Sequence, residues 1–189
     1  MATRQKEDVV TLLLAQHELI KGLIEKVELA QGEAKREPFE DLVRTLAVHE
    51  AAEQAVVHPA SRRASVPDSV VDSRLHEEER AEQVLAELYE LGVRHEDFDA
   101  KFRTFAASVI EHAELEEKEE FDQLRQQISA NDSALLADVV RVAEAVAPTR
   151  PHPQAGASAL ANIVAGPPLA IFDRVRDAVR DWRRKTESL

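Results

Sequence analysis

A histidine and a glutamate four residues apart, His49 and Glu53, stand on the apolar face of an amphipathic stretch of the chain. In an α-helix, residues at i and i+4 lie one above the other, so the two side chains would point the same way. The face extends in both directions at the alternating spacings of three and four residues that mark a buried helical surface. Its members are Phe39, Leu42, Leu46, His49, Glu53 and Val56. Because burying an ionisable group costs several kcal/mol unless it is paired or bound, this pair needs either protein partners or a metal.

Three other stretches show the same helical spacing, and each carries a histidine in phase with apolar residues. The first, over residues 6–30, contains His17, and the third, over about 67–91, contains His76. The fourth begins near Asp97 and contains His112, followed one turn later by Glu116 in a second His-x-x-x-Glu pattern. The second helix, which holds the first such pattern, is expected to begin at residue 38 and to end near residues 58–59, where a proline stands.

Four long helices with short connections predict an all-α, up-down four-helix bundle with extra C-terminal helices. At 1.5 Å of rise per residue, counting from the expected helix ends places the four histidines at one height in the bundle. A shorter fifth helix is expected over residues 133–146, capped by residues 131–133. We expect residues 1–146 to form the bundle, and residues 147–189 to form a Pro/Gly-rich strap and an amphipathic C-terminal helix.

The chain has no cysteine, so a metal would be bound by nitrogen and oxygen atoms. Imidazole and carboxylate ligands suit iron, manganese or zinc. Six candidate ligands, two of them carboxylates able to bridge, exceed what one tetrahedral zinc requires and favour two metals. The remaining histidines, His58, His95 and His152, fall at expected turns or in the strap, and we expect them to be exposed to solvent.

The charge and hydropathy of the chain exclude several classes of partner. A formal net charge of -12 disfavours nucleic acid and anionic lipid surfaces, which require a basic footprint. No apolar run approaches the roughly 20 residues of a transmembrane helix, and the charged N-terminus does not resemble a signal peptide. We expect a cytoplasmic protein whose C-terminal helix either docks on the bundle or forms a homodimer contact.

The order of these histidines and glutamates resembles the hemerythrin family, also called the HHE cation-binding domain, over about residues 5–130. The resemblance implies a four-helix bundle that holds a non-haem di-iron centre, with iron preferred over zinc or manganese. It further implies that histidines are terminal ligands and that two carboxylates bridge the irons. Carried over by position, Glu53 and Glu116 would bridge, His17 and His49 would bind one iron, and His76 and His112 would bind the other.

One position departs from the pattern of the oxygen-carrying members. Those proteins have a second histidine one turn after the third-helix histidine, where this chain has Arg80. A guanidinium has no lone pair to donate, so the second iron would have an open position, a water, or a carboxylate from Glu79 or Glu77. Arg80 would then tune the metal ligand, or it would only pair with an acid such as Glu77.

An open metal position favours binding or sensing of O₂, peroxide or nitric oxide over reversible O₂ transport. Two alternatives remain within the same family resemblance: an enzyme that disproportionates peroxide, and an iron-binding or iron-sensing protein that iron stabilises. A metal-free interaction bundle is the fourth hypothesis. The sequence contains no Gly-rich phosphate loop and no nucleophile elbow that would indicate another chemistry.

Overall fold

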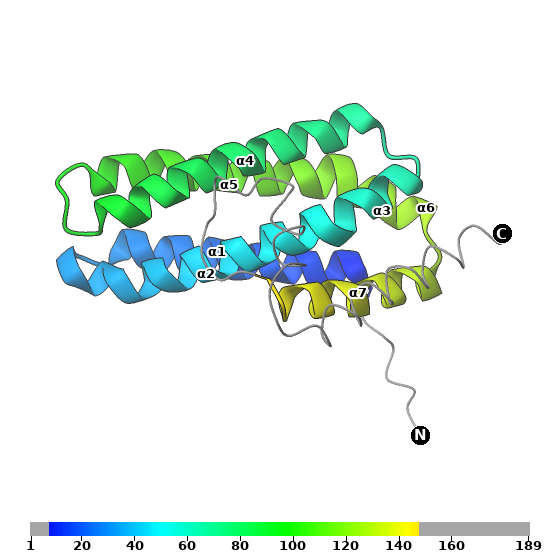
Figure 1. Ribbon diagram of the computed structural model, residues 1–189, viewed down its shortest axis with the longest axis horizontal. Helices are drawn as coiled ribbons and strands as arrows, with labels where there is room; N and C mark the ends of the chain where they lie inside the picture. The colour runs from blue at the N-terminus through cyan, green and yellow to red at the C-terminus, as the bar shows by residue number, and fades with distance from the viewer. Residues whose placement is uncertain (1–7, 148–189) are drawn as a thin grey trace, which may run out of the picture.

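The computed structural model describes residues 8–147, and within them it contains helices and turns but no strand. Four long helices run side by side along the longest axis: α1 (Val9–Leu29), α2 (Arg36–Ala52), α4 (Asp68–Leu91) and α5 (Phe98–Glu116) (Figure 1). A 3₁₀ turn, Gly32–Lys35, joins α1 to α2, and α4 and α5 are neighbours joined by a short loop. The predicted all-α, up-down four-helix bundle is confirmed. The strap and C-terminal helix expected over residues 147–189 lie almost entirely outside the described residues.

Two of the long helices continue through π-helical turns. After α2, the turn Glu53–Val57 leads into α3 (His58–Arg63), and after α5, the turn Glu117–Phe121 leads into α6 (Asp122–Gln127). The prediction that the second helix ends near residues 58–59 is therefore wrong. Pro59 is accommodated because it has no N–H to donate and stands directly after a turn that already interrupts the α-helical hydrogen-bond ladder.

Two hydrophobic cores fill the bundle, one on each side of a polar level. One core packs α1, α2, α4 and α5 together and is rich in phenylalanine, including Phe39, Phe98, Phe102 and Phe105. The other core joins the N-terminal part of α1 to α3, α6 and α7. In α1, Val10 belongs to the second core and Val27 to the first, while His17 lies between them. The polar level is therefore enclosed by apolar side chains at both ends.

A further helix, α7 (Ala130–Glu144), packs against α1 and α2 on the outside of the bundle (Figure 1). It begins three residues before the predicted start because Ser129 caps it, its side chain accepting a hydrogen bond from the backbone N–H of Asp132 at 3.2 Å. Residues 131–133, predicted as the cap, form its first turn instead. Among the described helices, none has the length and apolar character needed to span a membrane.

The N-terminal half of α4 faces the bundle differently from the prediction. We expected His76 and Arg80 to point inward in line with Leu88, but both are exposed, and the buried positions include Val71, Glu78 and Leu88. A line with a constant spacing of four residues turns around an α-helix by about 40° per step, because the helix has 3.6 residues per turn. Three such steps from Leu88 back to His76 rotate the expected line by about 120°, away from the core.

Candidate metal centre

Three histidines and two glutamates meet at the polar level between the two cores. His17 comes from α1, and His49 and Glu53 come from α2 and the first residue of the π turn that follows it. His112 and Glu116 come from the last two turns of α5. Both glutamates are completely buried, and even His112, the most open of the five, is only 15% exposed at its side chain. The two His-x-x-x-Glu patterns thus lie opposite each other inside the bundle.

The Nε2 atoms of the three histidines point at the two carboxylates. His17 Nε2 lies 3.4 Å from Glu116 Oε2 and 4.0 Å from Glu53 Oε1. His49 Nε2 lies 3.2 Å from Glu53 Oε2. His112 Nε2 lies 3.8 Å from Glu116 Oε2. Five donor groups therefore converge from three helices, which is the arrangement of a coordination site.

The Nδ1 atoms point away from the carboxylates, and each is hydrogen-bonded to a side-chain oxygen. The pairs are His17 with Glu117 at 2.8 Å, His49 with Gln16 at 2.8 Å, and His112 with Glu77 at 3.0 Å. Because these oxygens can only accept, Nδ1 carries the proton and the Nε2 lone pair faces the centre. Such outer hydrogen bonds fix the ring orientation and tautomer that a metal ligand needs.

Several atoms of the cluster are buried without any hydrogen-bond partner. They are His17 Nε2, both carboxylate oxygens of Glu53 and both carboxylate oxygens of Glu116. A buried polar atom without a partner costs about 1–3 kcal/mol, more if it is charged. A cation between the carboxylates would satisfy all five atoms at once, and imidazole and carboxylate donors suit iron, manganese or zinc. The residues present therefore fit a metal.

The electrostatics of the glutamates and of His49 agree with this assignment, whereas burial at His112 is outweighed by the hydrogen bond to Glu77 and the nearby carboxylates, which raise its pKa, so a metal would compete with a proton there. Burial, reinforced by the neighbouring Glu116 carboxylate, raises the pKa of Glu53 well above its usual value. Burial acts in the same direction on Glu116, but His17 and His112 outweigh it and lower the pKa of Glu116 to about 2. Burial and the nearby His17 lower the pKa of His49 to about 3, so this imidazole stays neutral and keeps its lone pair. Without a cation the two carboxylates share one negative charge, and a metal would displace the proton.

A π-helical turn follows each His-x-x-x-Glu pattern, and it changes which later residues face the centre. Residues five apart are about 140° apart around an α-helix, but the i→i+5 bonds of a π turn bring them closer to one face. His58, five residues after Glu53, is thereby buried, with 1% of its surface exposed. In the other helix the π turn buries both Glu120 and Phe121. The prediction that His58 is exposed to solvent is therefore wrong, whereas His95 is exposed as expected.

Three buried residues of the polar level were missed by the sequence reasoning: His58, Glu78 and Glu120. His58 Nε2 lies 2.6 Å from Glu78 Oε1, and His58 Nδ1 lies 3.0 Å from Glu120 Oε1. Burial by itself would lower the pKa of His58, but the two carboxylates outweigh it and raise the pKa well above its usual value. A signal for Glu78 was present, since it is in helical phase with the buried Val71 and Leu85. For His58 no sequence signal was present, because the π turn sets its direction.

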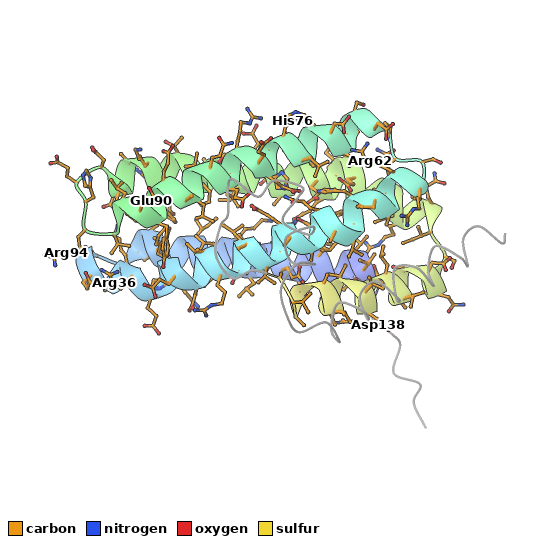
Figure 2. All side chains as sticks on the ribbon, in the orientation of Figure 1. Arg36, Arg62, His76, Glu90, Arg94 and Asp138 are labelled. Atoms are coloured by element: carbon orange, nitrogen blue, oxygen red, sulfur yellow. The ribbon has the colours of Figure 1, made fainter. Side chains whose placement is uncertain are left out.

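The third-helix residues predicted as ligands do not reach the centre. His76 lies on the outer side of α4 (Figure 2), where its Nδ1 donates to the backbone carbonyl of Asp72 at 2.6 Å. The prediction that His76 points inward is wrong, because steps of four residues back from Leu88 rotate away from the core along α4. Glu79 is also exposed. The structure therefore brings together five of the six residues predicted as primary ligands and leaves His76 on the surface.

Glu77 and Arg80 lie beside the centre. Glu77 accepts from His112 Nδ1 through one oxygen and from Arg74 Nη2, at 3.1 Å, through the other, so it holds a ligand histidine in place. The expected ion pair between Arg80 and Glu77 is thus replaced by one with Arg74. Arg80 is exposed and is one of the residues that line a cavity next to the cluster.

That cavity has a volume of about 380 Å³ and reaches the cluster from one side of the bundle. His17, His49 and His112 form part of its wall, and Ile20, Leu46, Val84, Val109 and Ile110 supply an apolar lining. Its charged lining residues are Lys21, Glu50, Glu77, Glu78, Arg80 and Glu111. The cavity is large enough for a small molecule to approach the convergent Nε2 atoms from within the protein.

Comparisons with known proteins agree with this geometry. The family model described as the hemerythrin HHE cation binding domain matches residues 8–124. Among solved structures, the chain is similar to a hemerythrin HHE cation binding domain-containing protein from Mycobacterium kansasii, with a TM-score of 0.65 and 17% sequence identity. The alignment covers 89% of this chain and 99% of that one. At this identity the similarity concerns the fold alone. No curated protein matches the chain.

Proposed function

Because the chain belongs to the hemerythrin HHE cation-binding family, we propose that it is a non-haem di-iron protein that binds or senses O₂, peroxide or nitric oxide. The observation that carries the proposal is the convergence of three Nε2 atoms on two buried carboxylates whose oxygens have no protein partner. In this proposal Glu53 and Glu116 bridge the two metals. His17 and His49 are terminal ligands of one, and His112 is a terminal ligand of the other.

The residues around the centre support a role in binding a small ligand. Bound iron would supply reversible redox chemistry and affinity for such ligands. Glu117, Gln16 and Glu77 hold the three histidines by their Nδ1 atoms, which keeps the Nε2 lone pairs directed at the metals. The apolar lining of the cavity admits a small, weakly polar molecule, and Arg80 and Lys21 supply positive charges among the carboxylates of the lining.

The histidine content of the centre argues against a reversible O₂ carrier. The carriers that this family includes have histidines on the third helix of the bundle, whereas α4 presents Glu78 to the polar level and keeps His76 outside. A centre with fewer imidazoles leaves a coordination position for water or a substrate, which is typical of reactive rather than closed metal sites. The charged side chains that line the cavity also leave peroxide disproportionation as a second candidate function.

Metal analysis combined with an optical spectrum tests the proposal. Protein from iron-replete expression should contain two iron ions per chain and absorb in the near ultraviolet, as an oxo-bridged di-ferric centre does. A chain that binds no metal under these conditions would refute the proposal and leave the metal-free interaction bundle. Steady-state release of O₂ from peroxide distinguishes the second candidate, because a sensor reacts with peroxide without sustained turnover.

The histidines of the chain offer a matched pair of variants for this test. His49→Gln removes a buried Nε2 donor, whereas His76→Gln changes an exposed histidine that the family pattern also pointed to. We expect His49→Gln to lose iron and its absorption, and His76→Gln to keep both. Loss of iron from His76→Gln would contradict the placement of that residue outside the centre.

A further inference from the structure

The two metal positions implied by the donor atoms share two residues and differ in the other two. One such group of donors is His17, His49, Glu53 and Glu116, and the other is Glu53, Glu78, His112 and Glu116. A third close group, His58, Glu116 and Glu120, is not a metal position, because both ring nitrogens of His58 are used in hydrogen bonds to Glu78 and Glu120. Within each group the ligand atoms lie within 4.8 Å of one another. The bridging glutamates belong to both groups. The positions therefore differ in their other two donors. The first has two imidazoles, His17 and His49, and the second has one imidazole, His112, and one carboxylate, Glu78.

Glu78 is built into the polar level in the manner of a ligand. Only 1% of its surface is exposed. Its Oε1 lies 2.6 Å from His58 Nε2, and its Oε2 accepts a hydrogen bond from Gln54 Nε2 at 2.8 Å. A carboxylate has about four lone-pair sites, so both oxygens keep a lone pair for a cation. The two hydrogen bonds fix the direction of the carboxylate, as outer partners of metal ligands do.

His58 is itself held in place from the far side. Its Nδ1 lies 3.0 Å from Glu120 Oε1, so its ring is fixed between Glu120 of one helix and Glu78 of another. The π turn that brings His58 inward thus serves to orient Glu78, and no apolar side chain could replace this support. The carboxylate of Glu78 is therefore positioned by Gln54 of the π turn after α2 and by His58 of α3, which Glu120 holds from the other side.

We propose that Glu78 is a ligand of the second metal and that the two positions are chemically unequal, the second being the better site for a hard cation such as Mn²⁺. This inference rests on the proposed dinuclear centre. Imidazole-rich sites suit iron and zinc, whereas carboxylate-rich sites suit manganese and magnesium. A position with one imidazole and three carboxylates discriminates less against Mn²⁺ than one with two imidazoles. When both ions are present, the protein takes iron at His17 and His49 and admits Mn²⁺ beside Glu78 and His112.

Anomalous diffraction locates the two metals without any assay of activity. The full chain is crystallised after anaerobic loading with equal amounts of Fe²⁺ and Mn²⁺, and data are collected at both absorption edges. We expect Glu78 within bonding distance of the second metal, and a several-fold larger manganese share there than at the first position. Two metals with equal manganese shares, or a Glu78 carboxylate away from both ions, would overturn the inference and leave the di-metal proposal intact. A chain without metal would overturn both.

Variants of adjacent glutamates give an independent test in solution. Glu78→Gln should weaken binding of the second metal by about 10-fold or more, the loss typical of disturbed metal sites. Glu78→His should give both positions two imidazoles and lower the manganese share at the second position. Glu79→Gln, one residue away on the exposed face, is the control and should bind both metals as the unmodified chain does. Circular dichroism checks that each variant folds. Unchanged binding by a folded Glu78→Gln would refute the role of Glu78.

Discussion

Removing the metal should lower the free energy of unfolding, because it leaves buried polar atoms of the centre without a partner. Five atoms, on His17, Glu53 and Glu116, are buried without a hydrogen-bond partner. At about 1–3 kcal/mol for each such atom, the empty centre costs on the order of 5–15 kcal/mol, which is as large as the whole stability of a typical domain. The raised pKa of Glu53 lets it retain a proton without metal, which places the cost toward the lower end, near 5 kcal/mol.

Thermal unfolding followed by circular dichroism measures this cost. For a chain of 150–250 residues, each kcal/mol shifts Tm by roughly 2–4 °C, so about 5 kcal/mol corresponds to a decrease of roughly 10–20 °C. The iron is first reduced and then removed with a chelator, and elemental analysis confirms that it has gone. Added iron should restore Tm in proportion to its binding.

A variant that cannot bind metal provides the control. Glu53→Gln removes one bridging carboxylate and puts in its place a neutral amide, which needs no proton to lie beside Glu116 in the metal-free protein. We expect the Tm of this variant to equal or exceed that of the metal-free protein. Neither the chelator nor added iron should change it. If complete removal of metal from the unmodified chain lowers Tm by less than about 3 °C, the unpartnered atoms are satisfied in some other way and the reasoning is wrong.

Three further predictions concern residues around the centre. His49→Gln should abolish iron binding while His76→Gln leaves iron content unchanged, as elemental analysis will show, because only His49 faces the carboxylates. Gln16→Leu removes the acceptor of His49 Nδ1 and should weaken iron binding by about 10–100-fold in competition with a chelator; unchanged affinity would deny the bond any role. His58 has a folded pKa above the unfolded value of about 6.5, so its stabilisation is present below that pH and is lost as pH rises through the folded pKa. Urea unfolding of metal-free protein should therefore show stability falling from neutral to alkaline pH, and His58→Gln should flatten that slope; an equal slope in both proteins would contradict it.

Regular helical spacing was sufficient to predict most of the bundle and five of the centre's residues. In α1, α2 and α5 the apolar positions alternate at spacings of three and four residues. The regular repeat of the α-helix therefore directs His17, His49 and His112 toward the same interior as those apolar residues. The i, i+4 relation then places Glu53 and Glu116 one turn beyond their histidines. Local helix geometry is enough to decide these positions.

The sequence by itself therefore determined the helical class, the buried faces of α1, α2 and α5, and both His-x-x-x-Glu pairs. Two features of the centre were decided by tertiary structure. In α4 the acids at residues 77–79 allow more than one inward face, and only packing of Val71 and Leu85 against the other helices turns Glu78 inward and His76 outward. The π turn after Glu53 brings His58 beneath Glu78, although local helix propensity favours a continuous α-helix. The contacts of the buried polar level outweigh that local preference, and they are made by residues distant in the chain.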